Sequence, residues 1–291
     1  MDHRGLFQWA KRHPLFLSLL LLFVVDFFIL TAYLERKHSV LTVVFLDVGQ
    51  GDAVFVEAPN GNQLLYDAGP PTGAVLRALS EVMPRWDRSI DVVVLSHPDQ
   101  DHIGGLLDMF DRYAFDVVVE SGASSTNGVW AEAENEIVKR NIAHFVAQKG
   151  MMIDLGGGVQ ADILYPDHDT TNIETNSASI IMRIRYGETS FLLSGDLPKN
   201  IEDYAVTVHG DQLEAQVLKL GHHGSRTSSS ETWLRTVKPG VAIISAGADN
   251  RYGHPHVEVL EMLDRLRIPY FITFNEGLIR FESNGKMVKR E

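Results

Sequence analysis

The sequence predicts an α/β domain with sheet layers between helices, preceded by one N-terminal transmembrane helix. Three observations support this prediction. An apolar run near the N-terminus is long enough to span a bilayer. From residue 41 onward, short β-rich runs separated by Gly, Asn and Pro alternate with helical patterns. No low-complexity linker or short-period repeat divides residues 41–291, so we expect one domain there.

The apolar run, LFLSLLLLFVVDFFILTAYL, occupies residues 15–34, and Asp26 is its only charged residue. About 20 helical residues cross the ~30 Å hydrocarbon core of a bilayer. We therefore expect residues 1–14 to form a short tail and residues 15–34 to form a membrane anchor. A cleavable signal peptide is the alternative, although the run exceeds the usual apolar core of roughly 7–15 residues and no clean Ala-x-Ala site follows.

Basic residues around the apolar run predict its orientation. Arg4, Lys11 and Arg12 precede it, whereas Arg36 and Lys37 follow it closely. Because basic residues are retained in the cytoplasm, this bias predicts a single-pass protein of the cell membrane with its N-terminus inside. The large domain is then expected on the extracytoplasmic side.

The charge and cysteine content limit the chemistry of the large domain. Residues 41–291 hold 21 basic and 35 acidic side chains, so the domain as a whole repels polyanions. The substrate is therefore small, or local cations overcome the overall field. The absence of cysteine excludes disulfides and thiolate metal sites, so any metal ligands must be His, Asp or Glu. No protein partner can be inferred.

Residues 41–147 contain short runs of β-branched and aromatic residues with helical patterns between them. PNGN at 59–62 indicates a hairpin turn. Apolar positions at Ile137, Val138 and Ile142 indicate a helix. The predicted strands are 41–48, 52–59, 62–69, 90–97 and 115–121, and the predicted helices are 73–83, 106–113 and 135–147.

The second half repeats this rhythm. Its predicted strands are 159–166, 179–186, 189–196, 215–220, 241–247 and 270–274, and its predicted helices are 199–207, 230–236 and 256–266.

The strongest local signal directly follows the predicted strand DVVVLS. Four potential metal ligands, His97, Asp99, Asp101 and His102, lie within six residues. Crowded carboxylates and imidazoles repel one another, and a bound cation relieves that repulsion. The alternative is a polar turn in which an Asp caps the next helix. Two glycines at 104 and 105 allow the backbone to approach closely, where a Cβ would obstruct.

The motif H-x-D-x-D-H resembles the H-x-H-x-D-H signature of the metallo-β-lactamase superfamily, with Asp99 in place of the second His. The resemblance implies an αββα sandwich that usually holds two metal ions. The remaining motifs of the family follow in order. They match Asp67 after an early strand, Asn176 at the place of the third-motif His, the bridging Asp196, and the pair His222 and His223 in GHHGS.

Longer motifs are similar to the hydrolase domain of ComEC-type DNA-uptake proteins. They are LDVGQGDA (46–53), SHPDQDHIGG (96–105), LLSGDL (192–197), LKLGHHGSRTSSS (218–230) and NRYGHPH (250–256). Bacterial phosphorylcholine esterases share the pattern. The multi-helix channel of ComEC proteins has no counterpart in a sequence with one membrane span, so we do not expect DNA transport.

The resemblance and the ligand chemistry imply two divalent ions. One ion is expected to bind Asp101, His102, Asp196 and one of His222 and His223. The other, held more weakly, is expected to bind His97, Asp99 and Asp196. Carboxylates favour Mn²⁺ more than imidazoles do, so Mn²⁺ competes with Zn²⁺ at this pair of sites.

We expect Asp101, His222 and His254 to form the catalytic set, with His254 contacting a substrate phosphate. His222 and His223 are adjacent, and they would point in opposite directions from an extended strand. One is then a metal ligand, and the other contacts the phosphate or protonates the leaving oxygen. The motif alone does not assign them. For His254, a structural loop role is the alternative.

Further residues are expected around the metals or the substrate. Asp67 is expected to orient a metal-bound imidazole. Gln50 and Asp52 are expected near the metal-bound water, or in a simple glycine-rich turn. Ser225 is expected to contact phosphate, or to belong to a polar loop whose serines cap the next helix. Asn176 and Tyr252 complete the predicted set.

Three functions follow from this pattern. The first is a metal-dependent phosphodiesterase that uses a metal-activated water, with a nuclease acting on DNA nearest to the resemblance. The second is a phosphoesterase for a small or cell-wall phosphodiester, which the acidic domain favours. The third is a binding module that keeps the fold without catalysis.

Overall fold

The computed structural model describes residues 13–37 and 40–291, with the backbone alone for residues 32–37. The chain divides into two compact units, Met1–Val40 and Leu41–Glu291. Most of the predicted tail, including Arg4, Lys11 and Arg12, lies outside the described residues.

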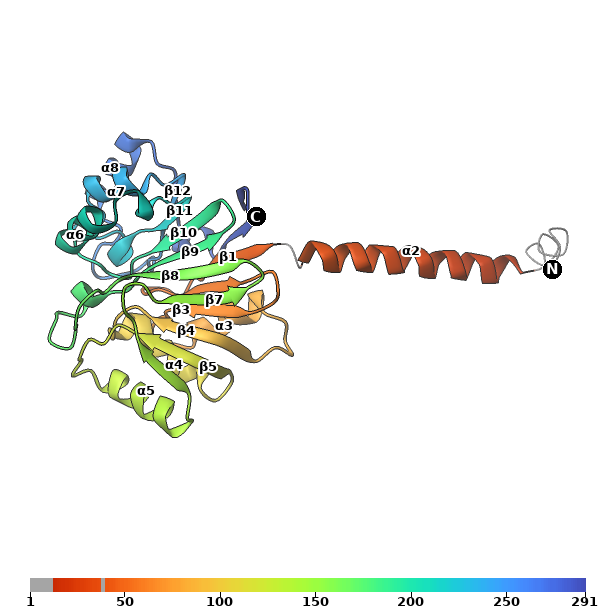
Figure 1. The fold of residues 1–291 in the computed structure, drawn as a ribbon, viewed down its shortest axis with the longest axis horizontal. Helices are drawn as coiled ribbons and strands as arrows, with labels where there is room; N and C mark the ends of the chain where they lie inside the picture. Colours follow the sequence, from red (N-terminus) through yellow and green to blue (C-terminus); the bar gives the residue numbers. More distant parts are fainter. Residues whose placement is uncertain (1–12, 38–39) are drawn as a thin grey trace. The chain divides into compact units, whose positions relative to one another are not determined.

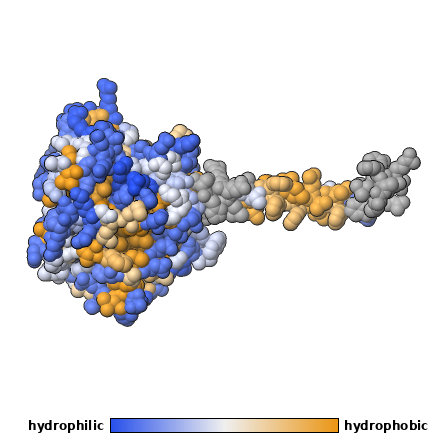
Figure 2. Space-filling model, viewed as in Figure 1, coloured by the Kyte–Doolittle hydropathy of each residue, from blue (hydrophilic) through white to orange (hydrophobic). Residues whose placement is uncertain are grey.

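The described part of the first unit forms the helix α2 (Pro14–Lys37), which begins with a proline at a position where its missing N–H costs no hydrogen bond. Residues 14–31 are long and apolar enough to cross a membrane, a criterion that a signal sequence also meets. Figure 2 shows an almost uniformly hydrophobic helix surface. The hydroxyls of Ser18 and Thr31 donate to carbonyls of the same helix, so neither requires water as a partner.

In the second unit, an eight-stranded sheet forms one half of a sandwich (Figure 1). Its strands from β3 to β6 are parallel, and the others pair antiparallel. The spatial order is β15 (Val288–Arg290), β14 (Ile279–Ser283), β1 (Leu41–Phe45), β2 (Val54–Glu57), β3 (Gln63–Tyr66), β4 (Ser89–Leu95), β5 (Ala114–Glu120) and β6 (Ala143–Val146).

A seven-stranded sheet forms the other half. Strands β10 to β13 are parallel, and β7 to β10 are antiparallel. The order is β13 (Tyr270–Ile272), β12 (Val241–Ile244), β11 (Val217–Lys219), β10 (Thr189–Leu193), β9 (Ile181–Tyr186), β8 (Val159–Tyr165) and β7 (Met152–Gly156).

Three apolar clusters divide the domain into four layers. The central cluster joins the two sheets, and there the ring of Phe281 lies 6.1 Å from Phe45 and 6.3 Å from Phe191. The second cluster packs α3 (Ala74–Val82), α4 (Gln100–Met109) and α5 (Gly128–Lys139) on the eight-stranded sheet. The third packs α6 (Lys199–His209), α7 (Glu231–Val237) and α8 (Val257–Leu266) on the seven-stranded sheet. The predicted αββα sandwich is confirmed.

Two predicted helices differ from the observed ones. The helix predicted at 135–147 is confirmed for residues 135–139 and wrong beyond them, because α5 ends at Lys139 and Asn141 adopts a left-handed conformation that breaks the helix. Residues 143–146 instead form β6, which extends the sheet beside β5. The helix predicted at 106–113 begins earlier, at Gln100, so the second half of the H-x-D-x-D-H motif lies in its first turn.

Several elements had no counterpart among the predicted ones. They are β7, β14, β15 and the one-turn helix α9 (Thr273–Glu276). Strand β14 pairs with β1, although the two strands lie near opposite ends of the domain's sequence. No local sequence pattern reveals such a pairing.

Parallel strands bring the polar loops to one edge of the sandwich. The carboxyl ends of β3 and β4 carry Asp67 and His97, and those of β10 and β11 carry Asp196 and His223. We call this the carboxyl edge. Sites in open α/β sheets usually lie at such an edge. The opposite edge, where β1, β4 and β5 begin, is the amino edge.

Two glycines allow α4 to lie against the loop that follows β3. The N–H of Ala68 donates to the carbonyl of His102 at 2.7 Å, and the N–H of Gly105 donates to Gly69 at 2.8 Å. A Cβ on Gly105 would lie 2.1 Å from the carbonyl oxygen of Ala68. A Cβ on Gly104 would meet a proline ring at 2.4 Å. The expectation that these glycines permit a close approach is confirmed.

We predict that Gly105→Ala destabilises the domain although alanine is the better helix former. Overpacking against backbone should lower the free energy of unfolding by about 2–3 kcal/mol, which corresponds to roughly 5–10 °C in Tm. Thermal unfolding followed by circular dichroism measures this. Gly128→Ala, where no atom lies within 4 Å of the added Cβ, is the control and should be neutral or slightly stabilising. Equal Tm values for the two variants would contradict the close-approach argument.

Candidate metal centre

Four side chains converge at the carboxyl edge from three separate segments. His102 and Asp101 lie in the first turn of α4, Asp196 follows β10, and His223 lies in the turn Gly221–Gly224 after β11. His223 has a positive φ of 55°, a conformation that is strained for a side chain with a Cβ. Such strain is retained where a side chain must point in a required direction.

The distances define a compact acid–imidazole cluster. His102 Nε2 lies 3.3 Å from Asp196 Oδ1, and His223 Nε2 lies 3.4 Å from Asp196 Oδ2. His223 Nε2 also lies 3.3 Å from Asp101 Oδ2. Asp196 therefore stands between the two rings. One atom each from Asp52, His102, Asp196 and His223 lies within 4.8 Å of the others.

Unsatisfied polar atoms in this cluster fit a cation. His102 Nε2, His97 Nε2 and Asp196 Oδ1 are buried and make no hydrogen bond to the residues that the structure describes. Buried polar atoms without partners are unfavourable unless a ligand or ion satisfies them. Imidazole nitrogens and carboxylate oxygens directed at one point form a donor set suited to Zn²⁺ or Mn²⁺.

The cluster attracts positive charge even without a metal. Burial lowers the pKa of His223, but Asp196 and Asp52 outweigh burial and raise that pKa to about 10. Burial raises the pKa of Asp196, but His223 and His102 hold it well below its usual range. Protons on the imidazoles thus balance the carboxylates, and a divalent ion would take their place as the neutralising charge.

Asp67 holds the ring of His102 from behind. Its Oδ2 lies 2.9 Å from His102 Nδ1, and it accepts hydrogen bonds from the N–H and hydroxyl of Ser96, both at 2.7 Å. Asp67 itself has a positive φ of 59°. With Nδ1 engaged, Nε2 of His102 is directed at Asp196.

A buried ion pair supports both imidazoles from the same side. Asp52 contacts the ammonium of Lys219, and both side chains are fully buried. The oxygens of Asp52 lie 3.6 Å from His102 Nδ1 and 3.4 Å from His223 Nδ1. Asp52 thus faces the Nδ1 atoms, whereas Asp101 and Asp196 face the Nε2 atoms. The closer partner of His223 Nδ1 is the carbonyl of Ser245, at 2.9 Å.

Sequence reasoning missed Lys219. The detectable signal was a single lysine within the apolar strand run VLKL. A buried lysine needs an acidic partner, and Asp52 was the acid left without a defined role.

His97 and Asp99 form a second group beside the first. The ring of His97 lies 4.1 Å from that of His102, and its Nε2 lies 3.7 Å from Asp99 Oδ2. Burial and the neighbouring His102 lower the pKa of His97 to about 3, so this imidazole is neutral. Asp99 occupies the N-cap position of α4 without making a capping hydrogen bond. Its carboxylate therefore remains available to a ligand.

The sequence analysis considered His222 and His223 on an extended strand, but the structure places neither of them on a strand. Both have positive φ within a tight turn, and the two side chains can approach the same group. His222 Nε2 lies 3.7 Å from Asp196 Oδ2, and the side chain is partly exposed. Its Nδ1 lies 3.2 Å from the hydroxyl of Thr227, which lies 3.0 Å from that of Ser225. Ser225 thus reaches the site through Thr227 and His222.

His254 lies over the two neighbouring histidines. Its ring lies 5.4 Å from His222 and 6.0 Å from His223. Its Nδ1 is buried and has no hydrogen-bond partner among the described residues. Burial, and then His223, lower its pKa to about 4. The exposed ring of Tyr252 stacks on it at 5.6 Å.

Two predicted residues, Gln50 and Asn176, have no hydrogen bond to the cluster among the described residues. Gln50 accepts a hydrogen bond from the N–H of Gly247 at 3.2 Å. The Oδ1 of Asn176 is buried and makes no hydrogen bond within the described part of the chain.

The comparisons with known proteins agree with this geometry. A family model described as the metallo-beta-lactamase superfamily matches residues 46–248. ComE operon protein 3 of Bacillus subtilis (strain 168) is 30% identical over 266 residues, which are 84% of this chain and 33% of that protein. Competence protein ComA of Neisseria gonorrhoeae is 34% identical over 243 residues, which are 82% of this chain and 32% of that protein. The chain thus spans about a third of the length of these relatives.

Solved structures share the fold at low sequence identity. The metallo-beta-lactamase fold protein YhfI from Bacillus subtilis matches with a TM-score of 0.54 and 13% identity, over 86% of this chain and all of that one. From the match over residues 46–248 and the fold, we conclude that the chain belongs to the metallo-β-lactamase superfamily.

Proposed function

We propose that this protein is a metal-dependent phosphodiesterase that is anchored to the membrane by α2. The observation that carries this proposal is the convergence of Asp101, His102, Asp196 and His223 around buried atoms without hydrogen-bond partners. Apolar packing would stabilise the fold better than such a donor set, so we infer that the donor set serves a function.

In this proposal two divalent ions, Zn²⁺ or Mn²⁺, bind at the cluster. The ligands of one are Asp101, His102, Asp196 and His223, and those of the other are His97, Asp99 and Asp196. When bound, such a pair of ions lowers the pKa of a water molecule and neutralises phosphate oxygens. The carboxylates and imidazoles of this chain would hold that charge at the carboxyl edge.

His222 and His254 suit the substrate side of the cluster. His222 is partly exposed, and Thr227 fixes its ring through Nδ1. We assign it to the leaving oxygen, where a proton must be delivered when the P–O bond breaks. His254 lies beside it with a free Nδ1, and we assign that nitrogen to a phosphate oxygen.

Nucleic acid is the first substrate class to test. The relatives named ComE operon protein 3 and competence protein ComA support a DNA substrate. The net acidity of residues 41–291 supports a small or cell-wall phosphodiester instead. In both cases the basic flanks of α2 predict an extracytoplasmic domain.

The predicted activity requires the metal ligands. His102→Ala and Asp196→Asn should each reduce hydrolysis of bis-p-nitrophenyl phosphate to the level of the EDTA-treated protein, because each removes charge or a ligand from the centre. Metal content per chain should fall in parallel, while the circular dichroism spectrum is retained. His168→Ala, which alters an exposed histidine outside the cluster, is the control. Parent-like turnover in both ligand variants would refute the ligand assignment.

Asp67 should act on metal affinity through the ring of His102. Removing such a supporting carboxylate usually weakens metal binding by 10–100-fold, and we expect a loss of about that size for Asp67→Ala. Asp67→Asn keeps one acceptor oxygen and should lose less. Competition with a chromogenic chelator measures the affinity. If Asp67→Ala binds Mn²⁺ and Zn²⁺ as tightly as the parent, His102 needs no support from Asp67.

Substrate assays separate the two phosphodiester classes from a binding module. A nuclease should cleave single-stranded DNA and bis-p-nitrophenyl phosphate with Mn²⁺ or Zn²⁺, with stronger salt inhibition on DNA. Cleavage of the small ester alone would favour a small substrate. A protein that retains less than one metal per chain and cleaves neither substrate would be a binding module, contrary to the proposal.

A further inference from the structure

Three arginines line a hollow at the side of the domain remote from the metal centre. Arg77 lies on α3, Arg88 precedes β4, and Arg112 follows α4. The hollow has a volume of about 620 Å³, and the hydroxyl-bearing Ser80 and Tyr113 also line it. We call these three residues the arginine group.

The charges of the arginine group are not neutralised within the protein. Arg88 donates to the hydroxyl of Tyr113 at 2.9 Å, and Arg77 donates to the carbonyl of Thr72 at 3.2 Å. Among the described residues, none of the three arginines forms an ion pair with a carboxylate. Three cations without carboxylate partners around one hollow form a local positive site in an otherwise acidic domain, and such a site favours an external anion.

Asp108 accepts a hydrogen bond at 2.8 Å from the N–H of Gly73, which lines the hollow, and the acids directly beside two of the arginines in the sequence are engaged elsewhere. Asp111, beside Arg112, pairs with Arg140 at 2.8 Å. Asp87, beside Arg88, accepts hydrogen bonds from Gln63 at 2.7 Å and from Ser89 at 3.0 Å.

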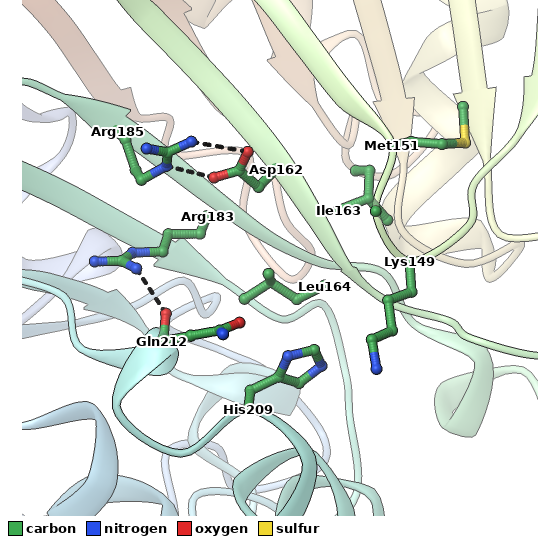
Figure 3. A pocket seen from close by; sticks show the side chains of 10 residues that line it. Lys149, Met151, Asp162, Ile163, Leu164, Arg183, Arg185, His209 and Gln212 are labelled. Carbon is green, nitrogen blue, oxygen red and sulfur yellow. Dashed lines mark hydrogen bonds and ion pairs between the residues drawn. The ribbon is translucent and has the colours of Figure 1, made fainter.

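Another cationic hollow shows the contrast. Lys149, Arg183 and Arg185 line a hollow of about 360 Å³ on the seven-stranded sheet (Figure 3). There Arg185 is paired with Asp162, and Arg183 donates to the carbonyl of Gln212 at 2.8 Å. One of its arginines is thus neutralised by a carboxylate, whereas no member of the arginine group has such a partner among the described residues.

A tryptophan on the loop that carries Arg88 provides a second, independent observation. The side chain of Trp86 is 86% exposed, more than any other large apolar side chain in the described part of 41–291. An indole in water is unfavourable, and tryptophan beside arginine is typical of membrane–water interfaces.

The topology places this loop at the amino edge of the domain. Strands β1, β3, β4 and β5 all run in one direction, so Leu41 and Arg88 lie at the same edge. Leu41, the first residue of the domain after the segment that carries the proposed anchor, is therefore at the same edge as Arg88.

We propose that the amino edge docks on anionic phospholipid, with Trp86 in the interfacial layer and Arg77, Arg88 and Arg112 on lipid phosphates. The metal centre lies at the carboxyl edge, a strand length of roughly 20 Å away. Docking therefore turns the metal centre toward the aqueous phase. The inference depends on α2 as a membrane anchor, and it is independent of the reaction catalysed at the metal centre.

Fluorescence of the full chain in lipid nanodiscs tests the docking. In a Trp9→Phe background, brominated phosphatidylglycerol should quench the emission of Trp86, whereas Trp130 and Trp233 are buried and should be spared. Trp86→Phe should remove the quenching. Phosphatidylcholine discs should give less quenching, because each arginine near an anionic surface favours docking by roughly fivefold.

Matched charge variants make the test specific. Replacing the arginine group by glutamine should abolish the difference between the two lipids. The same charge change at Arg235, Lys238 and Arg265, which pair with surface acids, should leave that difference intact. Unfolding midpoints check that both triple variants are folded. Because the measurement is fluorescence quenching, the result does not depend on enzymatic activity.

Three outcomes would overturn the proposal. One is quenching that is insensitive to Trp86 or to the arginine group. Another is shielding of Trp86 from solvent, in detergent without lipid, to a degree that increases with protein concentration. That result would indicate that the amino edge contacts another copy of the chain. The third is failure of the full chain to remain with the discs, which would remove the anchor itself.

Discussion

Buried carboxylates at the carboxyl edge impose the main physical constraint on this domain. Asp52, Asp67 and Asp196 are almost fully removed from water, and each must be neutralised or hydrogen-bonded to remain charged there. Lys219 neutralises Asp52, Ser96 and His102 bind Asp67, and two imidazoles face Asp196. The supporting groups of the proposed metal ligands thus have ion-pair or hydrogen-bond partners of their own, although neither oxygen of Asp52 has a hydrogen bond among the described residues.

The backbone around the cluster is adapted to this constraint. Asp67, His222 and His223 all have positive φ, and Gly104 and Gly105 admit backbone where any side chain would clash. Each of these conformations is unfavourable in isolation, by roughly 1–3 kcal/mol for a non-glycine residue. They persist because the two sheets and their helices form large apolar clusters on both sides.

Two distinct groups of side chains lie at opposite edges of the domain. The carboxyl edge carries the acid–imidazole cluster of the proposed metal centre, while the amino edge carries the arginine group and Trp86. This separation follows from parallel strands, since all their carboxyl ends meet at one edge and their amino ends at the other. In the function and docking that we propose, this arrangement keeps the surface that faces lipid apart from the surface that binds substrate.

The sequence by itself determined the fold class, the family and the apolar span. Ligand chemistry restricts metal sites to a few residue types at strand ends, so His97, Asp101, His102 and Asp196 were identifiable from local motifs. Only the tertiary structure decided which atoms face one another. The burial of Lys219 against Asp52, the pairing of β14 with β1, and β6 in place of a helix all depend on contacts between distant segments. Local sequence patterns carry no information on such contacts, because these contacts contribute free energy only after the two sheets have packed together.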